Sequence, residues 1–321
     1  MRKILIDLGG CDRPEQLLEG VLTAAEECPD VRLIAAVRGE KHPDTDAVEW
    51  MCCPTEIASG EPADTVLTRR DCTLVRALTR LKEDPEAVGM ISAGNTGALL
   101  AGSAAFLGRL PGVGRPALAS LLPTETGGMV CLLDCGANVD CKPQVMPAFA
   151  VMGSALMTGL YGIARPRVAA VSVGTERGKG NAFTREVCGL LENVPGIDFV
   201  GNMEACDALS GRYDVLVCDG FVGNVLLKSI EGAAKFAVRT MAATLAAESG
   251  DRALTGTVVE AAMQKFDYTG RAGAVLLGTG KPVVKAHGAA GSGTVPYVVR
   301  QVLALDDARF AERIGSAVKN M

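Results

Sequence analysis

Four polar segments of the chain carry the residue types that bind anions and polarise carbonyl groups: glycine beside asparagine or aspartate, with threonine and lysine nearby. Each segment follows an apolar stretch of strand length and precedes a helical pattern. Their glycines let the backbone approach a ligand closely, and the helix that follows offers unpaired N–H groups to an anion such as phosphate. The segments are Ile91–Gly97, Leu133–Lys142, Val173–Asn181 and Cys218–Asn224.

In an open parallel sheet, the carboxyl ends of the strands face one edge, and ligands bind there. We therefore expect the four segments to lie along one rim. The third segment has the fullest set of anion-binding groups, because it combines Thr175, Lys179 and Asn181 with three glycines. Its spacing is not that of a Walker A loop, and no Gly-x-Gly-x-x-Gly fingerprint follows the first expected strand.

The chain has two histidines. His287 follows a short apolar run and precedes a glycine, so we expect it at a strand end, where side chains of a cleft meet. His42 lies in a polar loop and is expected to be exposed. No Gly-x-Ser-x-Gly elbow or cysteine nucleophile signature occurs. An enzyme built on these residues is therefore expected to align two substrates for direct attack, without a covalent intermediate.

The eleven cysteines include no Cys-x-x-Cys pair. With so few histidines beside them, zinc and iron–sulfur sites are disfavoured, and we expect neither a metal nor another cofactor. Most of the cysteines lie in apolar runs, which favours buried free thiols in a reducing cytosol. The vicinal pair Cys52 and Cys53 leaves a redox role open.

The composition indicates a cytoplasmic α/β protein. Hydrophobic residues make up 48% of the chain and aromatic residues only 4%, a mixture that suits parallel strands covered on both faces. The formal net charge of −5 disfavours non-specific binding to nucleic acid. No run approaches the roughly 18 apolar residues of a membrane-spanning helix, and the first apolar run is too short for a signal peptide.

Apolar runs of strand length alternate with helical patterns, which predicts βαβ units and a mostly parallel sheet. We expect one unit over residues 1–321. The linker-like stretch Pro111–Pro116 divides it into two lobes around a central cleft, one of about residues 1–110 plus 270–321 and one of about 116–269. The expected strands are Lys3–Leu8, Val31–Val37, Ala47–Cys53, Val88–Ser92, Ala117–Leu122, Met129–Cys135, Val168–Gly174, Asp214–Cys218, Ala274–Leu277 and Pro282–Lys285.

Two expected helices carry further information. In Asp64–Lys82, leucines at helical spacing form a core stripe and three arginines share the opposite face. That face is either solvated or a dock for an acidic protein partner. In Arg252–Phe266, an apolar stripe favours packing in a core or a dimer interface, with membrane-surface contact as the alternative. The leucines are Leu67, Leu74, Leu78 and Leu81, and the arginines are Arg69, Arg76 and Arg80.

Eight ordered blocks of the chain are distinctive when taken together. They are Ser92–Ala98, Arg115–Ala119, Asp134–Pro143, Phe149–Gly153, Gly174–Glu176 with Lys179–Asn181, Phe199–Asn202, Asp219–Phe221 with Gly223–Asn224, and Lys285–Gly288. These blocks closely resemble the bacterial acyl-ACP:phosphate acyltransferases of phospholipid synthesis, the PlsX family. The resemblance extends from about Ile4 to the region after Gly288, which is nearly the whole chain.

Three stretches depart from the family pattern. Asp7–Pro14 is one residue shorter than the family's opening, and the family's Lys-Asp-Ser-Ser reads Arg70–Thr73 here. Ala289 and Ala290 replace the usual serines, so we assign no side-chain role there.

The resemblance implies transfer of an acyl group from acyl-[acyl-carrier protein] to inorganic phosphate, giving acyl phosphate and free carrier protein. The acyl phosphate then feeds a membrane glycerol-3-phosphate acyltransferase. The resemblance also implies a three-layer α/β/α, Rossmann-like fold akin to phosphotransacetylases and the isocitrate dehydrogenase superfamily. A homodimer and peripheral association with the membrane are further implications.

The residues and the resemblance together predict the site. Lys179, with Asn181 and Thr175, holds the phosphate, and a phosphate oxygen attacks the thioester carbonyl directly. Amide or backbone N–H groups stabilise the oxyanion, a histidine or lysine assists the departing thiol, and aspartates orient the cations. The catalytic candidates are Lys179, His287, Lys142 and Asn95, and the substrate-binding candidates are Thr96, Gly97, Asn138, Asp140, Thr175, Glu176, Asn181, Asp219, Gly220 and Asn224.

Three alternatives stay open. The chain is alternatively a phosphotransacylase that acts on acyl-CoA, a nicotinamide-dependent decarboxylating dehydrogenase, or a membrane-recruited scaffold without activity. Comparing acyl-CoA with acyl-carrier protein as donors tests the phosphotransacylase alternative. Binding of NAD tests the dehydrogenase alternative, and phosphate-dependent turnover tests the scaffold alternative.

Overall fold

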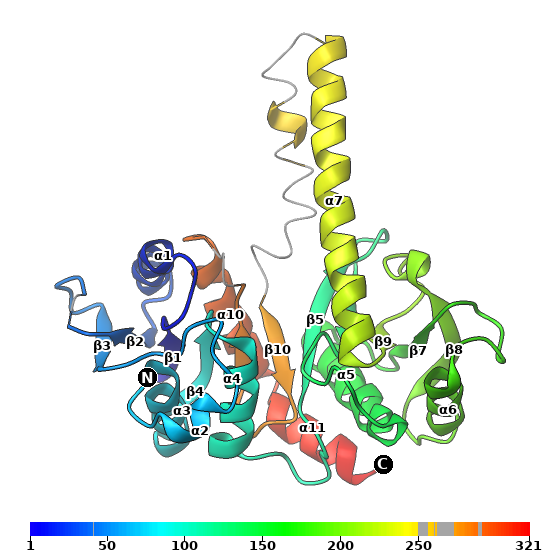
Figure 1. The fold of residues 1–321 in the computed structure, drawn as a ribbon, viewed down its shortest axis with the longest axis horizontal. Coiled ribbons are helices and arrows are strands. Elements are labelled where there is room, and N and C mark those ends of the chain that lie inside the picture. Colours follow the sequence, from blue (N-terminus) through cyan, green and yellow to red (C-terminus); the bar gives the residue numbers. More distant parts are fainter. Residues whose placement is uncertain (41, 250–255, 260, 262–272, 288–290) are drawn as a thin grey trace.

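The structure, a computed structural model, describes residues 1–40, 42–249, 256–259, 261, 273–287 and 291–321. Its centre is an eleven-stranded sheet in the order β3-β2-β1-β4-β11-β10-β5-β6-β9-β7-β8, with helices packed on both faces (Figure 1).

The two halves of the sheet are each parallel, but they run in opposite directions. In the first half, the parallel strands are β1 (Arg2–Asp7), β2 (Val31–Arg38), β3 (Val48–Cys53), β4 (Ala87–Ser92) and β11 (Val283–Lys285). In the second half, they are β6 (Met129–Leu133), β7 (Arg167–Ser172), β8 (Asp198–Glu204) and β9 (Val215–Val217). The reversal occurs at β10 (Ala274–Leu277) and β5 (Ala117–Pro123). Here β10 is antiparallel to β11 and β5, and β5 is antiparallel to β6.

This reversal corrects one expectation from the sequence. The segment after β4 leaves its strand in the direction opposite to the segments after β6, β7 and β9. The four predicted segments therefore do not share one rim of a parallel sheet.

Alternating side chains of the strands enter cores on opposite faces of the sheet, as the two-residue period of a strand requires. Ile4 and Ile6 of β1 pack with α1 (Pro14–Glu27) and α10 (Thr294–Asp307), whereas Leu5 packs with α3 (Thr73–Glu83). In the second half, Leu133 joins the core that contains α5 (Met146–Tyr161) and α6 (Ala182–Leu191), and Leu132 packs with α7 (Gly220–Ser249). The chain therefore forms three layers, α/β/α, as predicted.

The shorter elements connect these layers. They are α2 (Thr65–Thr68), α4 (Thr96–Gly102), the π-helical turn Ser103–Leu107, the 3-10 turns Pro143–Val145 and Ala205–Asp207, and α11 (Phe310–Lys319), which packs on α5.

All ten predicted strands are present, with small shifts at their ends. The missed strand is β8, where Gly201 has a positive φ of 99° and interrupts the apolar pattern. The predicted helix Asp64–Lys82 is wrong as a single element. It breaks between α2 and α3 because Cys72 is extended (φ −81°, ψ 159°) and forms a bridge with Thr55.

The break changes two residues of the predicted faces. Leu67 is 44% exposed and does not join the core stripe, whereas Leu74, Leu78 and Leu81 are buried. Arg69 lies in the break, so it does not share a helix face with Arg76.

The helix α7 is 30 residues long, and its distal part projects away from the sheet (Figure 1). Phe236 and Met241 on this part are 72% and 50% exposed. Across the described residues, no helix combines the length and the hydropathy that crossing a bilayer requires. The predicted apolar helix Arg252–Phe266 lies mostly outside the described residues.

The contact between α7 and the turn after β6 gives a prediction. An added Cβ at Gly223 would lie 1.9 Å from the carbonyl oxygen of Asp134, whereas one at Gly232 would meet nothing within 4 Å. We expect Gly223→Ala to lower the free energy of unfolding by about 1–3 kcal/mol, since backbone must move. Gly232→Ala on the same helix should raise it by about 0.5–1 kcal/mol. Urea denaturation measures both, and equal stability of the two variants would contradict the close contact.

Candidate active site

A cavity of about 360 Å³ lies at the reversal of the sheet. Three of the four predicted segments reach it, through Thr96 in the first, Gly136 in the second and Asn224 in the fourth. The end of β11 adds Lys285 and His287. The structure thus brings together predicted residues that are far apart in the sequence.

Apolar side chains form another part of the same wall. Leu118 comes from β5, and Leu227 comes from α7. A larger cavity of about 730 Å³ lies between α5 and α11. None of the predicted site residues lines that cavity, so the smaller one is the candidate active site.

The side chain of Asn95 fixes the first segment. Its Oδ1 accepts a hydrogen bond from the Ala98 N–H at 2.9 Å and caps α4. Its Nδ2 donates to the carbonyl oxygens of Ala58, Ser59 and Glu61 at 3.2, 3.1 and 2.8 Å. Because both N–H groups are used within the described residues, this conformation offers no N–H of Asn95 to an oxyanion. Its catalytic role stays a prediction.

A buried carboxylate holds the second segment. Asp134 is 0% exposed, and it accepts hydrogen bonds from the backbone N–H groups of Leu118, Ala137 and Asn138 at 3.0, 3.0 and 2.6 Å. The Asn138 side chain also donates to Asp134, at 2.8 Å, and to Pro116 O, at 2.9 Å. These bonds place Gly136 at the cavity and give the predicted binding residue Asn138 a structural role.

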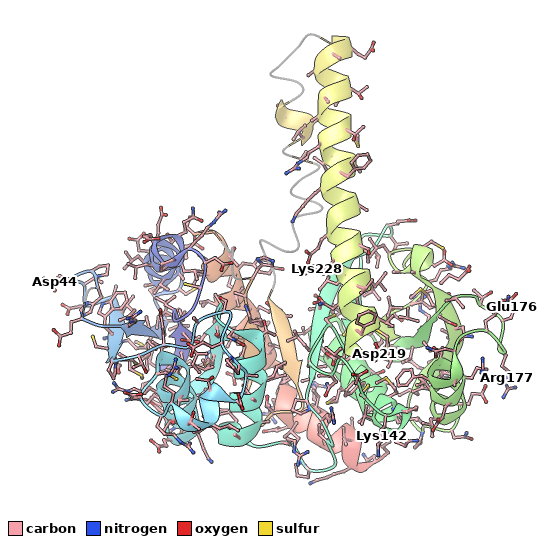
Figure 2. All side chains as sticks on the ribbon, viewed as in Figure 1. Asp44, Lys142, Glu176, Arg177, Asp219 and Lys228 are labelled. Atoms are coloured by element: carbon pink, nitrogen blue, oxygen red, sulfur yellow. The ribbon has the colours of Figure 1, made fainter. Side chains whose placement is uncertain are left out.

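The fourth segment is hydrogen-bonded to the second and packs closely against it. The N–H of Gly220 donates to Asn138 O at 2.8 Å, and a Cβ at Gly220 would meet the Asn138 backbone at 2.8 Å. Asp219 Oδ1 accepts from the Val222 N–H at 2.8 Å at the start of α7. Figure 2 shows Asp219 and Lys228 near the base of α7, between the two halves of the sheet.

The third segment, Val173–Asn181, lies apart from the cavity. Figure 2 shows Glu176 and Arg177 at the outer edge of the second half of the sheet. Asn181 Oδ1 accepts from the Thr184 N–H at 2.8 Å and caps α6.

The remaining predicted groups also lie outside the cavity lining. Among the described residues that line it, none belongs to the third segment, and Gly97 is likewise absent. The structure therefore separates Lys179 from His287, and the phosphate-binding role of the third segment stays a prediction. The exposed predicted residues outside the lining are Asp140, Lys142, Thr175, Glu176, Lys179 and Asn181.

Three basic side chains line the cavity. Lys228 Nζ forms an ion pair with Glu231 Oε2 at 2.9 Å, both on α7. Lys285 Nζ donates to the carbonyl oxygens of Ala93, at 3.1 Å, and Ala286. Burial and the nearby charge of Lys228 lower the pKa of His287 below its ordinary value. Lys228 and Lys285 supply the ammonium groups of the lining.

A buried row of polar residues lies behind Lys285. Ser92 pairs with Asp7 on one side and with Lys285 on the other, across the adjacent strands β1, β4 and β11. Asp7 is 2% exposed; its carboxylate accepts from Ser92 Oγ at 2.8 Å and from the Gly9 N–H at 3.1 Å. Burial raises the pKa of Asp7, and the charge of Lys285 opposes that rise.

The arginines of the predicted carrier dock are engaged within the chain. Arg69 forms a two-bond ion pair with Glu61 at 2.8 and 2.6 Å. Arg80 pairs with Asp84 at 3.2 Å, and exposed Arg76 donates to a backbone carbonyl of β3 at 2.7 Å.

The sequence missed four ionisable side chains in or next to this site. Lys285 and Asp7 each end an apolar strand, and a polar residue at a strand end was the available signal. Lys228 and Glu231 lie inside a long helix, where nothing in the pattern distinguishes them from solvated surface residues.

The eleven cysteines are free thiols in the structure, six of them buried. Cys52 and Cys53 form no disulfide. Cys135 lines the cavity, and burial raises the pKa of its thiol to about 12.

The fold is that of the phosphotransacylases. A phosphotransacetylase from Streptococcus pyogenes superposes with a TM-score of 0.61 at 18% identity, covering 97% of this chain and 94% of its own. An isocitrate dehydrogenase from Methylococcus capsulatus gives a TM-score of 0.50 at 10% identity, covering 99% and 100%. These likenesses concern the fold alone and agree with the predicted fold class.

The sequence comparison is more specific. The family described as "Fatty acid synthesis protein" matches residues 2–313. A protein named phosphate acyltransferase from an Exiguobacterium species is 36% identical over 327 residues, covering 98% of each chain. The chain belongs to this family, the PlsX family that the sequence blocks resemble, and it is an acyltransferase.

The buried turn after β6 gives a second prediction. Asp134→Asn keeps the shape but turns one acceptor oxygen into a donor that faces backbone N–H groups. We expect a loss of about 2–3 kcal/mol in the free energy of unfolding. Exposed Asp140→Asn, in the same segment, should change it by less than about 0.5 kcal/mol. Denaturant unfolding compares the two, and a stable Asp134→Asn protein would show that the carboxylate does not hold the turn.

Proposed function

We propose that the protein transfers a fatty acyl group from acyl-[acyl-carrier protein] to inorganic phosphate, and that the acyl phosphate serves phospholipid synthesis. The observation that carries the proposal is the composition of the cavity. Two lysines, Lys228 and Lys285, stand beside the leucines of β5 and α7, so one pocket offers positive charge to phosphate and an apolar wall to an acyl chain. The name phosphate acyltransferase, which near-full-length relatives carry, supports transfer of an acyl group to phosphate.

In this proposal, a phosphate oxygen attacks the thioester carbonyl directly. The protein holds the two substrates in contact and stabilises the oxyanion with fixed N–H groups and positive charge, which is usually the largest catalytic contribution. The C–S bond then breaks, and the thiol leaves as a thiolate of pKa about 8.5. His287 at the cavity, or Lys142 as predicted from the sequence, supplies the proton.

The raised pKa of the Cys135 thiol in the cavity supports a mechanism without a covalent acyl-enzyme. A nucleophilic cysteine needs a thiolate, and burial raises the pKa of Cys135 to about 12. At pH 7 almost no thiolate forms. Cys135 is therefore disfavoured as a nucleophile, which supports attack by a phosphate oxygen.

The proposal includes partners. The acidic carrier protein requires a basic surface, for which Arg76 is the exposed candidate on α3. A second copy of the chain fits the exposed apolar side chains Phe236 and Met241 of α7. Peripheral membrane association and delivery of acyl phosphate to a membrane glycerol-3-phosphate acyltransferase complete the proposal.

Turnover with two donors tests the function. The protein is incubated with inorganic phosphate and either long-chain acyl-carrier protein or the matching acyl-CoA, and acyl phosphate is trapped with hydroxylamine. We expect phosphate-dependent product from the carrier-protein donor and much less from acyl-CoA. Preference for acyl-CoA would favour the phosphotransacylase alternative, and no turnover with either donor would contradict the proposal.

The carrier dock gives a third prediction. Arg76→Glu should raise the KM for acyl-carrier protein severalfold, because it reverses a charge that faces an acidic partner. The kinetics with a short acyl thioester should not change. Lys82→Glu, also exposed on α3, is the matched control for net charge. If Arg76→Glu lowers kcat/KM equally for acyl-carrier protein and for the short thioester, the variant is misfolded. If Lys82→Glu raises the KM for acyl-carrier protein as much as Arg76→Glu does, a specific dock at Arg76 is ruled out.

A further inference from the structure

Two lysines in and next to β11, Lys281 and Lys285, differ in how many of their N–H donors the protein itself uses. Lys281 Nζ donates to three carbonyl oxygens, those of Leu81, Asp84 and Ala87, at 2.6, 2.9 and 2.8 Å. An ammonium group has three N–H donors, so Lys281 is saturated by the protein. Lys281 therefore joins the end of α3 to the connection between β10 and β11, and it does not line the cavity.

Lys285 lines the cavity and has only two such bonds, to Ala93 O and Ala286 O. Within the described residues, its third N–H has no acceptor, and no carboxylate forms an ion pair with it. The neighbouring cation, Lys228, is already paired with Glu231. Of these two lysines, Lys285 is therefore the one whose charge and donor are both available to a ligand.

Lys285 ends a row of polar residues across the sheet, and two carbonyl oxygens hold its ammonium group. Asp7, Ser92 and Lys285 are paired in register across three adjacent parallel strands, and the first two are buried and hydrogen-bonded to each other. The two carbonyl bonds orient the ammonium. A donor held in this way needs no reorganisation when an anion arrives.

We propose that Lys285 binds the attacking phosphate through its third N–H, while the carbonyl oxygens of Ala93 and Ala286 hold the ammonium group in place. The inference rests on the proposed function, because it takes phosphate as the nucleophile. The phosphate then lies at the end of β11, next to His287, rather than at the third segment and Lys179. From there its oxygen reaches a thioester lying along Leu118 of β5.

The inference gives a pH dependence. Burial, together with the charge of Lys228, lowers the pKa of Lys285 to about 8 against the opposing charges of Asp7, Asp12 and Cys11. Glu231 and His287 also face the cavity. Phosphate binds the protonated form, so kcat/KM for phosphate should fall as the pH rises through about 8. Bound phosphate stabilises the ammonium, so kcat itself should fall only at higher pH.

The test compares Lys285→Met with Lys281→Met in the intact protein. We expect Lys285→Met to raise the KM for phosphate about 10- to 100-fold, the effect of losing one hydrogen bond to a charged group. The KM for acyl-carrier protein should not change. Lys281→Met should lower thermal stability but leave the KM for phosphate unchanged. Lys285→Arg should restore part of the phosphate affinity and abolish the alkaline fall, because arginine stays charged.

Other outcomes overturn the inference. An unchanged KM for phosphate in Lys285→Met overturns it, and so does an equal rise of both KM values. If the KM for phosphate rises in Lys179→Ala but not in Lys285→Met, the phosphate binds at the third segment. If the wild type shows no turnover, the proposed function fails. Calorimetric titration with inorganic phosphate then still tests Lys285, since equal binding by wild type and Lys285→Met contradicts its role.

Discussion

The cavity depends on the reversal of strand direction at β10 and β5. A wholly parallel sheet collects its strand ends along one edge and places ligands there. Here β4 and β6 run in opposite directions with β5 between them. The site therefore forms across β5, where Leu118 lines the cavity together with Lys285 at the end of β11 and Gly136 in the turn after β6. An apolar wall between two polar borders suits a substrate with a long acyl chain and a reactive end.

Buried carboxylates hold both borders. Asp134 shapes the turn after β6 through three backbone N–H groups, and Asp7 supports the end of β11 through Ser92. Each carboxylate is desolvated, and such burial is tolerated only when hydrogen bonds replace water. Neither carboxylate lines the cavity; Asp134 fixes the backbone of the turn that does, and Asp7 is hydrogen-bonded to Ser92, the neighbour of Lys285 in the sheet. The turn after β6 thus keeps its shape through buried hydrogen bonds, as the proposed binding of a thioester carbonyl beside it requires.

The sequence predicted the three-layer fold and most strands, because apolar runs of strand length are local signals. The reversal could not be predicted, since β10 pairs with β5, more than 150 residues earlier in the chain. The role of Asn95 was equally hidden. Asparagine before a helix serves as an N-cap or as a ligand donor, and the residue type is the same for both. Only the surrounding carbonyls of Ala58, Ser59 and Glu61 distinguish the two uses.

The chemistry of the cavity follows from what burial does to each ionisable group. Burial makes Cys135 a poor nucleophile by raising its pKa, and it makes Lys285 easier to deprotonate by lowering its pKa. An anion in the cavity reverses only the second effect, because its charge stabilises the ammonium. In the proposed mechanism, phosphate therefore completes the site by binding to it. The substrates then bring the nucleophile and the leaving group, and the protein supplies position and positive charge.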